Sequence, residues 1–195
     1  MGQAATRTRL SPAEYLAFER ASEQKHEYAN GEIFATPGCT REHSLLAGNI
    51  QRELGNALLE RACEVHTSDM RVKITSTGRY VYPDASVVCG NPVFEDAEVD
   101  TLLNPNVIVE VLSDSSEAYD RGDKFAQYRS VPSNMEYVVV SQKEVRIEHF
   151  QRQPDGRWLL SILGSGMQLE LESIGVVIGV DRVYRKVPLA PAANE

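Results

Sequence analysis

The chain has 195 residues, of which 42% are hydrophobic and 25% are charged, with a formal net charge of −8 at pH 7. This length allows one domain with a substantial core, and the composition is that of an ordinary globular protein. Its apolar runs, such as Val107–Val109, are far shorter than the about 20 residues that cross a bilayer, and residues 1–6 lack the apolar segment of a secretory signal. We therefore expect a cytoplasmic protein without a membrane partner.

The acidic charge argues against a protein that holds nucleic acid mainly through phosphate contacts, because such proteins are usually basic. The basic residues are scattered, with two small groups in Arg71–Arg79 and Arg121–Arg129. A nuclease is still compatible with this charge, since metal ions can supply positive charge at the scissile phosphate. Strong nonspecific DNA binding would need a partner or an oligomer.

The three cysteines, Cys39, Cys63 and Cys89, are an odd number and form no Cys-x-x-Cys pair. This pattern argues against a disulfide framework and against a structural zinc site. We expect the three to be small buried residues.

The N-terminal part of the chain predicts two helices and a strand. Ser11 before Pro12, with Glu14 three residues after the cap, forms a capping box and predicts a helix over residues 12–21. The Asn-Gly pair at 30–31 predicts a turn, followed by a strand over 33–36. Apolar residues at helical spacing predict a long helix over 42–62 with one buried face.

The rest of the chain is mostly extended, apart from a helix predicted over 117–129. The apolar run Val107–Leu112 is rich in β-branched residues, which is typical of a central strand covered on both faces. Other strands are predicted at 64–67, 70–75, 80–89, 136–140, 146–151, 157–163, 168–172 and 176–180, and residues 187–195 form a tail. The element order predicts a single α/β domain (core about 10–185). It would have one mixed central β-sheet flanked by helices, with additional antiparallel strands toward the C-terminus.

Glu110 is the most informative residue for function. It lies between Val109 and Val111 in the strand that should be most buried. An unpaired carboxylate there would be strongly destabilising, so Glu110 must be paired, protonated or bound to a metal ion. A structural ion pair is the alternative to a functional role.

Asp84 is a second acid at an apolar strand, in the segment Tyr82–Val88. Pro83 has no backbone donor and suits the first residue of a strand. If Asp84 and Glu110 are neighbours, a divalent cation would relieve their repulsion, and carboxylate oxygens are ligands that Mg²⁺ prefers. Taken alone, Asp84 could equally cap a turn.

Lys124 borders the predicted sheet-facing side of the helix over 117–129, which also carries Phe125 and Tyr128. Its long side chain can reach inward from there. For this residue alone, a surface lysine paired with Asp120 is the simpler interpretation.

Several segments in order along the chain resemble the Uma2 (DUF820) family of the PD-(D/E)xK nuclease superfamily. The principal motifs are Pro83-Asp84, Ile108–Ser113 and Tyr119–Arg129. The likeness covers roughly residues 10–185 and includes five further segments: Ala13–Leu16, His26–Ile33, Glu42–Ser44, Ser68–Val72 and Asp155–Trp158.

The resemblance implies a restriction-endonuclease-like core in which Asp84 and Glu110 bind a metal ion, with the Val111 carbonyl as a third ligand. The sequence departs from the superfamily pattern at Leu112, because the motif would have a lysine at this position, two residues after the glutamate. In families of this kind the lysine can move to a nearby helix, and Lys124 is the position that fits.

Two accessory residues are proposed, Glu27 from the same resemblance and His43 from its place at the start of the long helix. Glu27 would be a further acid near the metal, and the alternative is a solvated partner of Lys25 or Arg20. His43 would contact phosphate or orient a ligand, and the alternative is a structural hydrogen bond at the start of its helix.

We thus expect a Mg²⁺-dependent endonuclease acting on DNA, with Mn²⁺ as a substitute and Lys124 stabilising charge on the phosphate. The alternative is a non-catalytic nuclease fold that serves as a binding or assembly module, as a homodimer. No Gly-x-Ser-x-Gly or His-Glu-x-x-His motif points to another hydrolase class.

Overall fold

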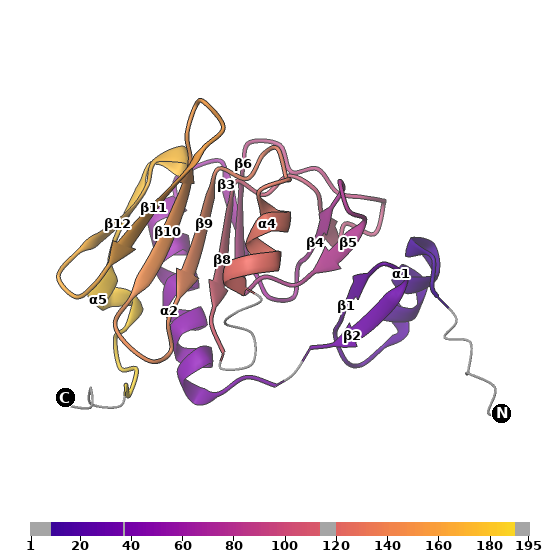
Figure 1. Ribbon diagram of the computed structural model, residues 1–195, viewed down its shortest axis with the longest axis horizontal. Coiled ribbons are helices and arrows are strands. Elements are labelled where there is room, and N and C mark those ends of the chain that lie inside the picture. The colour runs from indigo at the N-terminus through magenta and orange to yellow at the C-terminus, as the bar shows by residue number, and fades with distance from the viewer. Residues whose placement is uncertain (1–8, 37, 114–119, 190–195) are drawn as a thin grey trace.

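Residues 9–36, 38–113 and 120–189 are described by the computed structural model (Figure 1). Its helical segments are α1 (Pro12–Ala21), α2 (Arg41–Leu58), the π-helical turn η1 (Asp120–Lys124), α4 (Phe125–Tyr128), the 3₁₀ turn η2 (Glu172–Ile174) and α5 (Val180–Val183). The strands are β1 (His26–Ala29), β2 (Glu32–Ala35), β3 (Cys63–Thr67), β4 (Arg71–Ile74), β5 (Arg79–Val81), β6 (Ala85–Cys89), β7 (Thr101–Leu102), β8 (Val107–Val111), β9 (Glu136–Val140), β10 (Ile147–Arg152), β11 (Trp158–Leu163), β12 (Gln168–Leu171) and β13 (Val176–Gly179).

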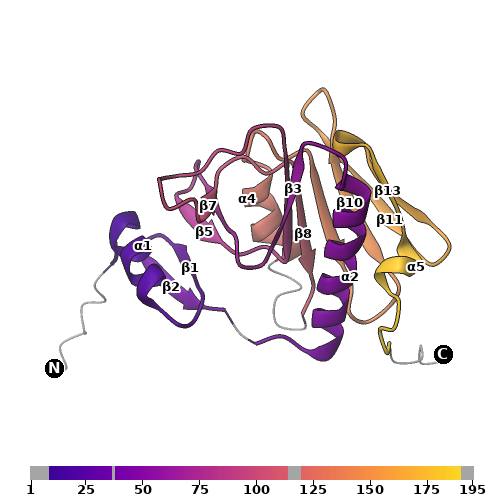
Figure 2. The same cartoon turned by 180° about the vertical axis from the view of Figure 1, so that it is seen from behind.

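The larger sheet has the strand order β11-β10-β9-β8-β6-β3. Only β8 and β9 pair in parallel, and the other neighbours are antiparallel. Helix α2 covers one face and α4 the other, as the two opposite views show (Figures 1 and 2). All five residues of β8 are buried, which confirms that Val107–Leu112 contains a central strand covered on both faces.

Helix α2 packs on the sheet through residues spaced four apart. Leu46, Ile50, Leu54 and Leu58 are buried on one side of the helix. They join one core cluster with β6, β8 and β9 and with the β12–β13 hairpin and α5. The helix ends at Leu58, four residues before the predicted end.

The second sheet has the order β2-β1-β5-β4-β7 and carries α1. Tyr15 of α1 stacks on Tyr28 of β1 with ring centroids 4.9 Å apart, and Tyr80 of β5 completes this small core. Arg20, at the end of α1, forms ion pairs of 2.8 Å with Asp96 and with Asp100. These contacts hold the N-terminal hairpin of β1 and β2 against β4, β5 and β7.

The predicted mixed central sheet flanked by helices is confirmed, but the described strands also form a second sheet and a separate β12–β13 hairpin. The predicted strand over 80–89 is in fact two strands, β5 and β6, which belong to different sheets. The residues between them, Tyr82–Asp84, leave the ladder, and Pro83 has no N–H to donate there. This break places Asp84 immediately before the first residue of β6.

Two other predictions differ from the structure. Of the helix predicted over 117–129, residues 120–128 are helical, first as a π turn and then as α-helix, and residues 117–119 lie outside the described part. Of the predicted tail, Val187 and Leu189 pack against the main core, and residues 190–195 lie outside the described part. No helix in the described ranges is long and apolar enough to span a bilayer.

The prediction that the three cysteines are small buried residues is wrong for all of them. Cys63 and Cys89 stand opposite each other in the β3–β6 ladder and form a disulfide, and Cys39 is exposed. Counting cysteines could not show this, because only strand pairing brings residues 26 positions apart into contact.

Reducing this disulfide is expected to lower the free energy of unfolding by about 2–4 kcal/mol, because the reduced chain gains entropy in the unfolded state. Urea unfolding of oxidised wild type and of the Cys63→Ser/Cys89→Ser variant would measure the difference, with Cys39→Ser as the control. Three free thiols in a thiol titration of oxidised protein would contradict the bond.

Candidate active site

Asp84 and Glu110 meet at one end of the larger sheet. Strands β6 and β8 are antiparallel with Ala85 opposite Val109, and continuing this register by one residue sets Asp84 opposite Glu110. The Asp84 carboxylate accepts a hydrogen bond of 2.7 Å from the N–H of Val111, the residue after Glu110. The two acids therefore lie on neighbouring strand ends.

Glu110 is only 4% exposed and has two donors on one carboxylate oxygen. Lys124 Nζ lies 2.8 Å from Glu110 Oε1, and the Tyr128 hydroxyl donates to the same oxygen at 2.7 Å. Lys124 itself is 7% exposed, so the helix carries its ammonium inward to the strand. The prediction that Lys124 reaches inward is thus confirmed over the surface alternative.

Tyr128 is a site residue that sequence analysis placed only in the core. It is fully buried, and burial together with the nearby Glu110 carboxylate raises the pKa of Tyr128 well above 10. The hydroxyl therefore stays protonated and acts as a donor to Glu110. Its position four residues after Lys124, on the same helical face, was the available signal.

Glu27 comes from the other sheet and joins this cluster. Its Oε1 lies 3.6 Å from Lys124 Nζ and accepts a hydrogen bond from the N–H of Tyr82 at 3.4 Å. The alternative partners, Lys25 and Arg20, pair instead with aspartates. Glu27 thus lies near the same ammonium as Glu110, and its role near a metal ion stays a prediction.

His43 lies in the first turn of α2 and contacts the other acid. Thr40 caps the helix by accepting the His43 N–H at 3.1 Å, and His43 Nε2 lies 3.2 Å from Asp84 Oδ2. Gln51, two turns further along α2, donates to the Asp84 carbonyl at 2.7 Å. Helix α2 thus holds Asp84 from the side opposite to α4.

The donor set suits a hard cation such as Mg²⁺. Within the described residues, no three His, Cys, Asp or Glu side chains are arranged to hold a metal ion. Mg²⁺, however, is usually bound through one or two carboxylates with water and substrate phosphate as the other ligands, so Asp84 and Glu110 would be its protein carboxylates. Val111 contacts Asp84 through its backbone N–H. The role of the Val111 carbonyl as a metal ligand stays a prediction.

The position of the motif lysine is occupied by a core residue. Leu112 is buried in the second core cluster, between the sheet and α4. Lys124 brings an ammonium to the same strand from the helix side. Lys124 therefore lies next to Glu110, and its role as the migrated motif lysine stays a prediction.

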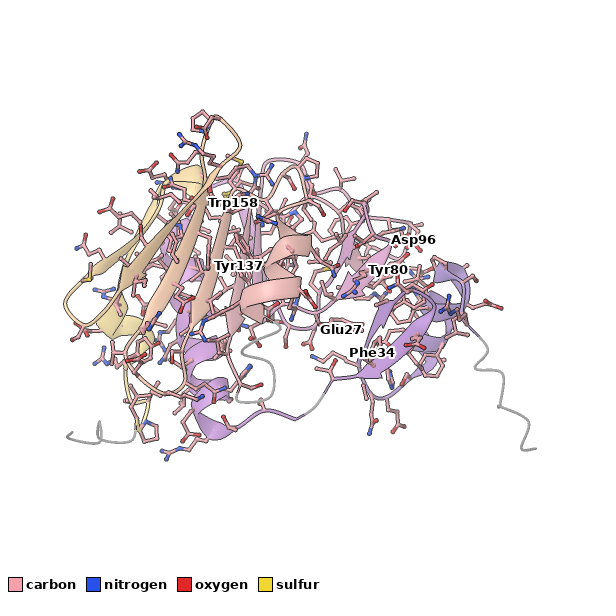
Figure 3. The ribbon with its side chains drawn as sticks, in the orientation of Figure 1. Glu27, Phe34, Tyr80, Asp96, Tyr137 and Trp158 are labelled. Atoms are coloured by element: carbon pink, nitrogen blue, oxygen red, sulfur yellow. A yellow bond between two sulfur atoms is a disulfide. The ribbon has the colours of Figure 1, made fainter. Side chains whose placement is uncertain are left out.

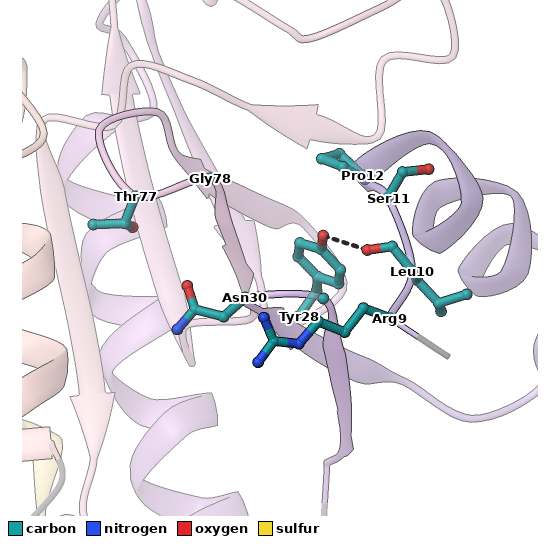
Figure 4. Close-up of a pocket in the computed structure, with 9 residues that line it drawn as sticks. Arg9, Leu10, Ser11, Pro12, Tyr28, Asn30, Thr77 and Gly78 are labelled. Carbon is teal, nitrogen blue, oxygen red and sulfur yellow. Dashed lines mark hydrogen bonds between the residues drawn. The ribbon is translucent and has the colours of Figure 1, made fainter. Parts of the chain in front are cut away.

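A shallow pocket elsewhere in the molecule contains none of these residues. It lies between the start of α1, the β1–β2 turn and the β4–β5 turn, where Tyr28 donates to the Leu10 carbonyl (Figure 4). Its lining has no carboxylate and does not include the candidate site.

The comparison with protein families shows to which family this chain belongs. Residues 12–180 match the model of the Uma2 family, which is described as "Putative restriction endonuclease". The chain belongs to the Uma2 family. The resemblance inferred from the motifs is thereby confirmed.

Two further proteins are similar to this chain over most of its length. The uncharacterized protein slr1290 of Synechocystis sp. is 38% identical over 177 residues, which are 91% of this chain and 92% of that protein. A second uncharacterized protein of this organism, sll1609, is 36% identical over 167 residues, or 85% and 94% of the two chains.

A solved structure shares the α/β fold of this Uma2 chain. It is the crystal structure of a putative nuclease belonging to DUF820 from Anabaena variabilis, with a TM-score of 0.72, 14% sequence identity and coverage of 90% of this chain and 97% of that one. At this identity the likeness concerns the fold alone.

Removing the Tyr128 hydroxyl is expected to destabilise the Uma2 domain by about 1.5–3 kcal/mol, the usual contribution of a hydrogen bond to a charged group. Chemical denaturation of Tyr128→Phe would measure it. Tyr28→Phe is the matched control, because that hydroxyl donates to a neutral carbonyl and its loss should cost about 0.5–1.5 kcal/mol. Equal losses in the two variants would contradict a special role for Tyr128.

Proposed function

We propose that this Uma2 protein is a Mg²⁺-dependent endonuclease that hydrolyses phosphodiester bonds in DNA. The supporting observation is the buried Lys124–Glu110 pair beside Asp84, at the end of two neighbouring strands. Buried charges of both signs at one strand end, together with a second acid from another element, are typical of a catalytic site rather than of a core.

Asp84 and Glu110 would hold the ion, and Mn²⁺ would substitute for it. Bound there, Mg²⁺ would supply positive charge at the phosphate and lower the pKa of a water molecule. The carboxylates contribute oxygen ligands, and the hydrogen bond from Val111 N–H keeps the Asp84 carboxylate in place.

The other residues of the candidate site would orient the reacting groups and balance their charge. Lys124 would stabilise negative charge on the phosphate as it increases in the transition state. Tyr128 keeps Glu110 in position through its hydroxyl. His43 lies near the N-terminus of α2, where the helix dipole favours an anionic group, and would contact a phosphate oxygen. By analogy with the superfamily, the products would carry a 5′-phosphate and a 3′-hydroxyl.

The test is cleavage of supercoiled plasmid and of single-stranded circular DNA with Mg²⁺, with Mn²⁺ and with EDTA. Cleavage that requires the metal ion and a heat release on titration of Mg²⁺ into the protein are expected. Metal-independent cleavage, or the absence of both cleavage and metal binding, would contradict the proposal.

A second function is favoured by other features. Edge strand β11 exposes Leu159 (53%) and Ile162 (53%), and an apolar edge strand readily pairs with another chain. The exposed edge strand, the leucine at position 112 in place of the motif lysine and the acidic net charge of the chain support a non-catalytic assembly module that forms homodimers. Light scattering, combined with the metal titration, separates the two functions, since the module would dimerise without binding Mg²⁺.

A further inference from the structure

Phe34 lies on the face of the N-terminal hairpin that carries Glu27. The two residues stand directly opposite each other in the β1–β2 ladder, so their side chains project from the same face (Figure 3). Glu27 in turn reaches Lys124 Nζ at 3.6 Å. On the other face of the hairpin, Tyr28 stacks on Tyr15 of α1. Phe34 therefore projects on the side of the candidate site.

The Phe34 ring is the most exposed aromatic side chain in the described part of the chain, at 51%. Among the described aromatic residues, Phe18 is the next most exposed, at 41%, and its ring contacts His26 at 5.1 Å. Within the described ranges Phe34 has no aromatic ring contact of its own. An exposed aromatic ring on the face that carries a residue of the candidate site offers apolar surface that a ligand can cover.

We propose that Phe34 is a stacking platform for an unpaired nucleobase next to the scissile phosphate, so that the protein selects single-stranded DNA or DNA with unpaired bases. This inference rests on the proposed nuclease function and specifies its substrate class. Phe34 stands opposite Glu27, which in turn lies near Lys124, so the ring would border a DNA strand that enters the site along this face of the hairpin.

The charge of the protein favours this kind of recognition. With a net charge of −8, phosphate contacts alone give weak binding. Stacking on an aromatic ring is independent of phosphate charge and tolerates any base, since every base has a π face. In an intact duplex the bases are stacked on each other, and the ring gains no such contact.

The experiment measures binding by fluorescence anisotropy of a labelled single-stranded oligonucleotide and of its duplex, with Ca²⁺ in place of Mg²⁺. Phe34→Ala is expected to weaken single-strand binding by about 5- to 150-fold, the range observed for loss of one stacked base. Duplex binding should stay nearly unchanged. Phe34→Trp should retain single-strand binding, and the added indole fluorescence should be quenched by the oligonucleotide.

Phe18→Ala is the matched control, because it removes an exposed aromatic ring from α1 and should change neither measurement. Wild-type binding of single strands by Phe34→Ala, an equal loss with Phe18→Ala, or a changed oligomeric state in place of changed DNA binding would overturn the inference.

The binding experiment also separates this inference from the proposed function. If the wild type cleaves DNA and Phe34→Ala binds single strands normally, only the stacking inference fails. If the wild type binds single strands through Phe34 without cleaving them, the proposed catalysis fails and the stacking stands. If it neither binds nor cleaves DNA, both fail.

Discussion

Replacing Asp84 with asparagine is expected to lower the rate of Mg²⁺-dependent DNA cleavage by about a thousandfold. The asparagine oxygen can still accept the Val111 N–H, so the strand end keeps its local structure. The substitution removes one of the two carboxylates that would hold the metal ion. Such an ion stabilises transition-state charge by several kcal/mol, and about 4 kcal/mol corresponds to three powers of ten in rate.

Single-turnover cleavage of plasmid DNA by wild type and Asp84→Asn measures this effect. Asp155→Asn is the matched control, since Asp155 is half-exposed in the β10–β11 turn and should leave the rate unchanged. Thermal unfolding adds a readout independent of catalysis, because Mg²⁺ should raise the melting temperature of the wild type but not of Asp84→Asn. Undiminished cleavage by Asp84→Asn would exclude the proposed site.

Replacing Lys124 with methionine is expected to abolish cleavage and also to destabilise the protein by about 3–5 kcal/mol in the absence of metal. The Glu110 carboxylate is almost completely buried, and Lys124 Nζ at 2.8 Å is its cationic neighbour from the helix. Without that ammonium, Glu110 would be left near Glu27 as a buried like charge, which raises the free energy of the ionised state.

The comparison with Lys25→Met isolates the effect of burial. Lys25 also forms an ion pair of 3.0 Å, but with Asp69, whose side chain is 84% exposed, and such pairs contribute about 0–1 kcal/mol. The double variant Glu110→Gln/Lys124→Met should regain much of the stability, because the glutamine is neutral and still accepts from Tyr128. Chemical denaturation measures all four proteins, and a loss no larger in Lys124→Met than in Lys25→Met would contradict the buried pair.

Sequence patterns were most informative where burial is a local property of the chain. The β-branched run around Glu110 predicted a strand covered on both faces, and β8 is that strand. The Ser11 capping box predicted α1 with both of its hydrogen bonds. In these segments the neighbours along the chain determine the conformation, so periodicity and capping chemistry are sufficient evidence.

The patterns failed where contacts join distant segments. The run over 80–89 resembles one strand, yet it changes sheets at Tyr82–Asp84. The Cys63–Cys89 bond and the second sheet depend on which strands pair, and pairing leaves little trace in either strand alone.

The sequence by itself determined that two carboxylates, Asp84 and Glu110, stand in or directly beside apolar strand segments, because the cost of burying a charge can be inferred from its immediate neighbours. Only the tertiary structure decided which groups compensate them. Lys124 and Tyr128 reach Glu110 from a helix, and His43 reaches Asp84 from another. Such contacts depend on strand register and on the packing of helices across the sheet, which no local spacing of residues encodes.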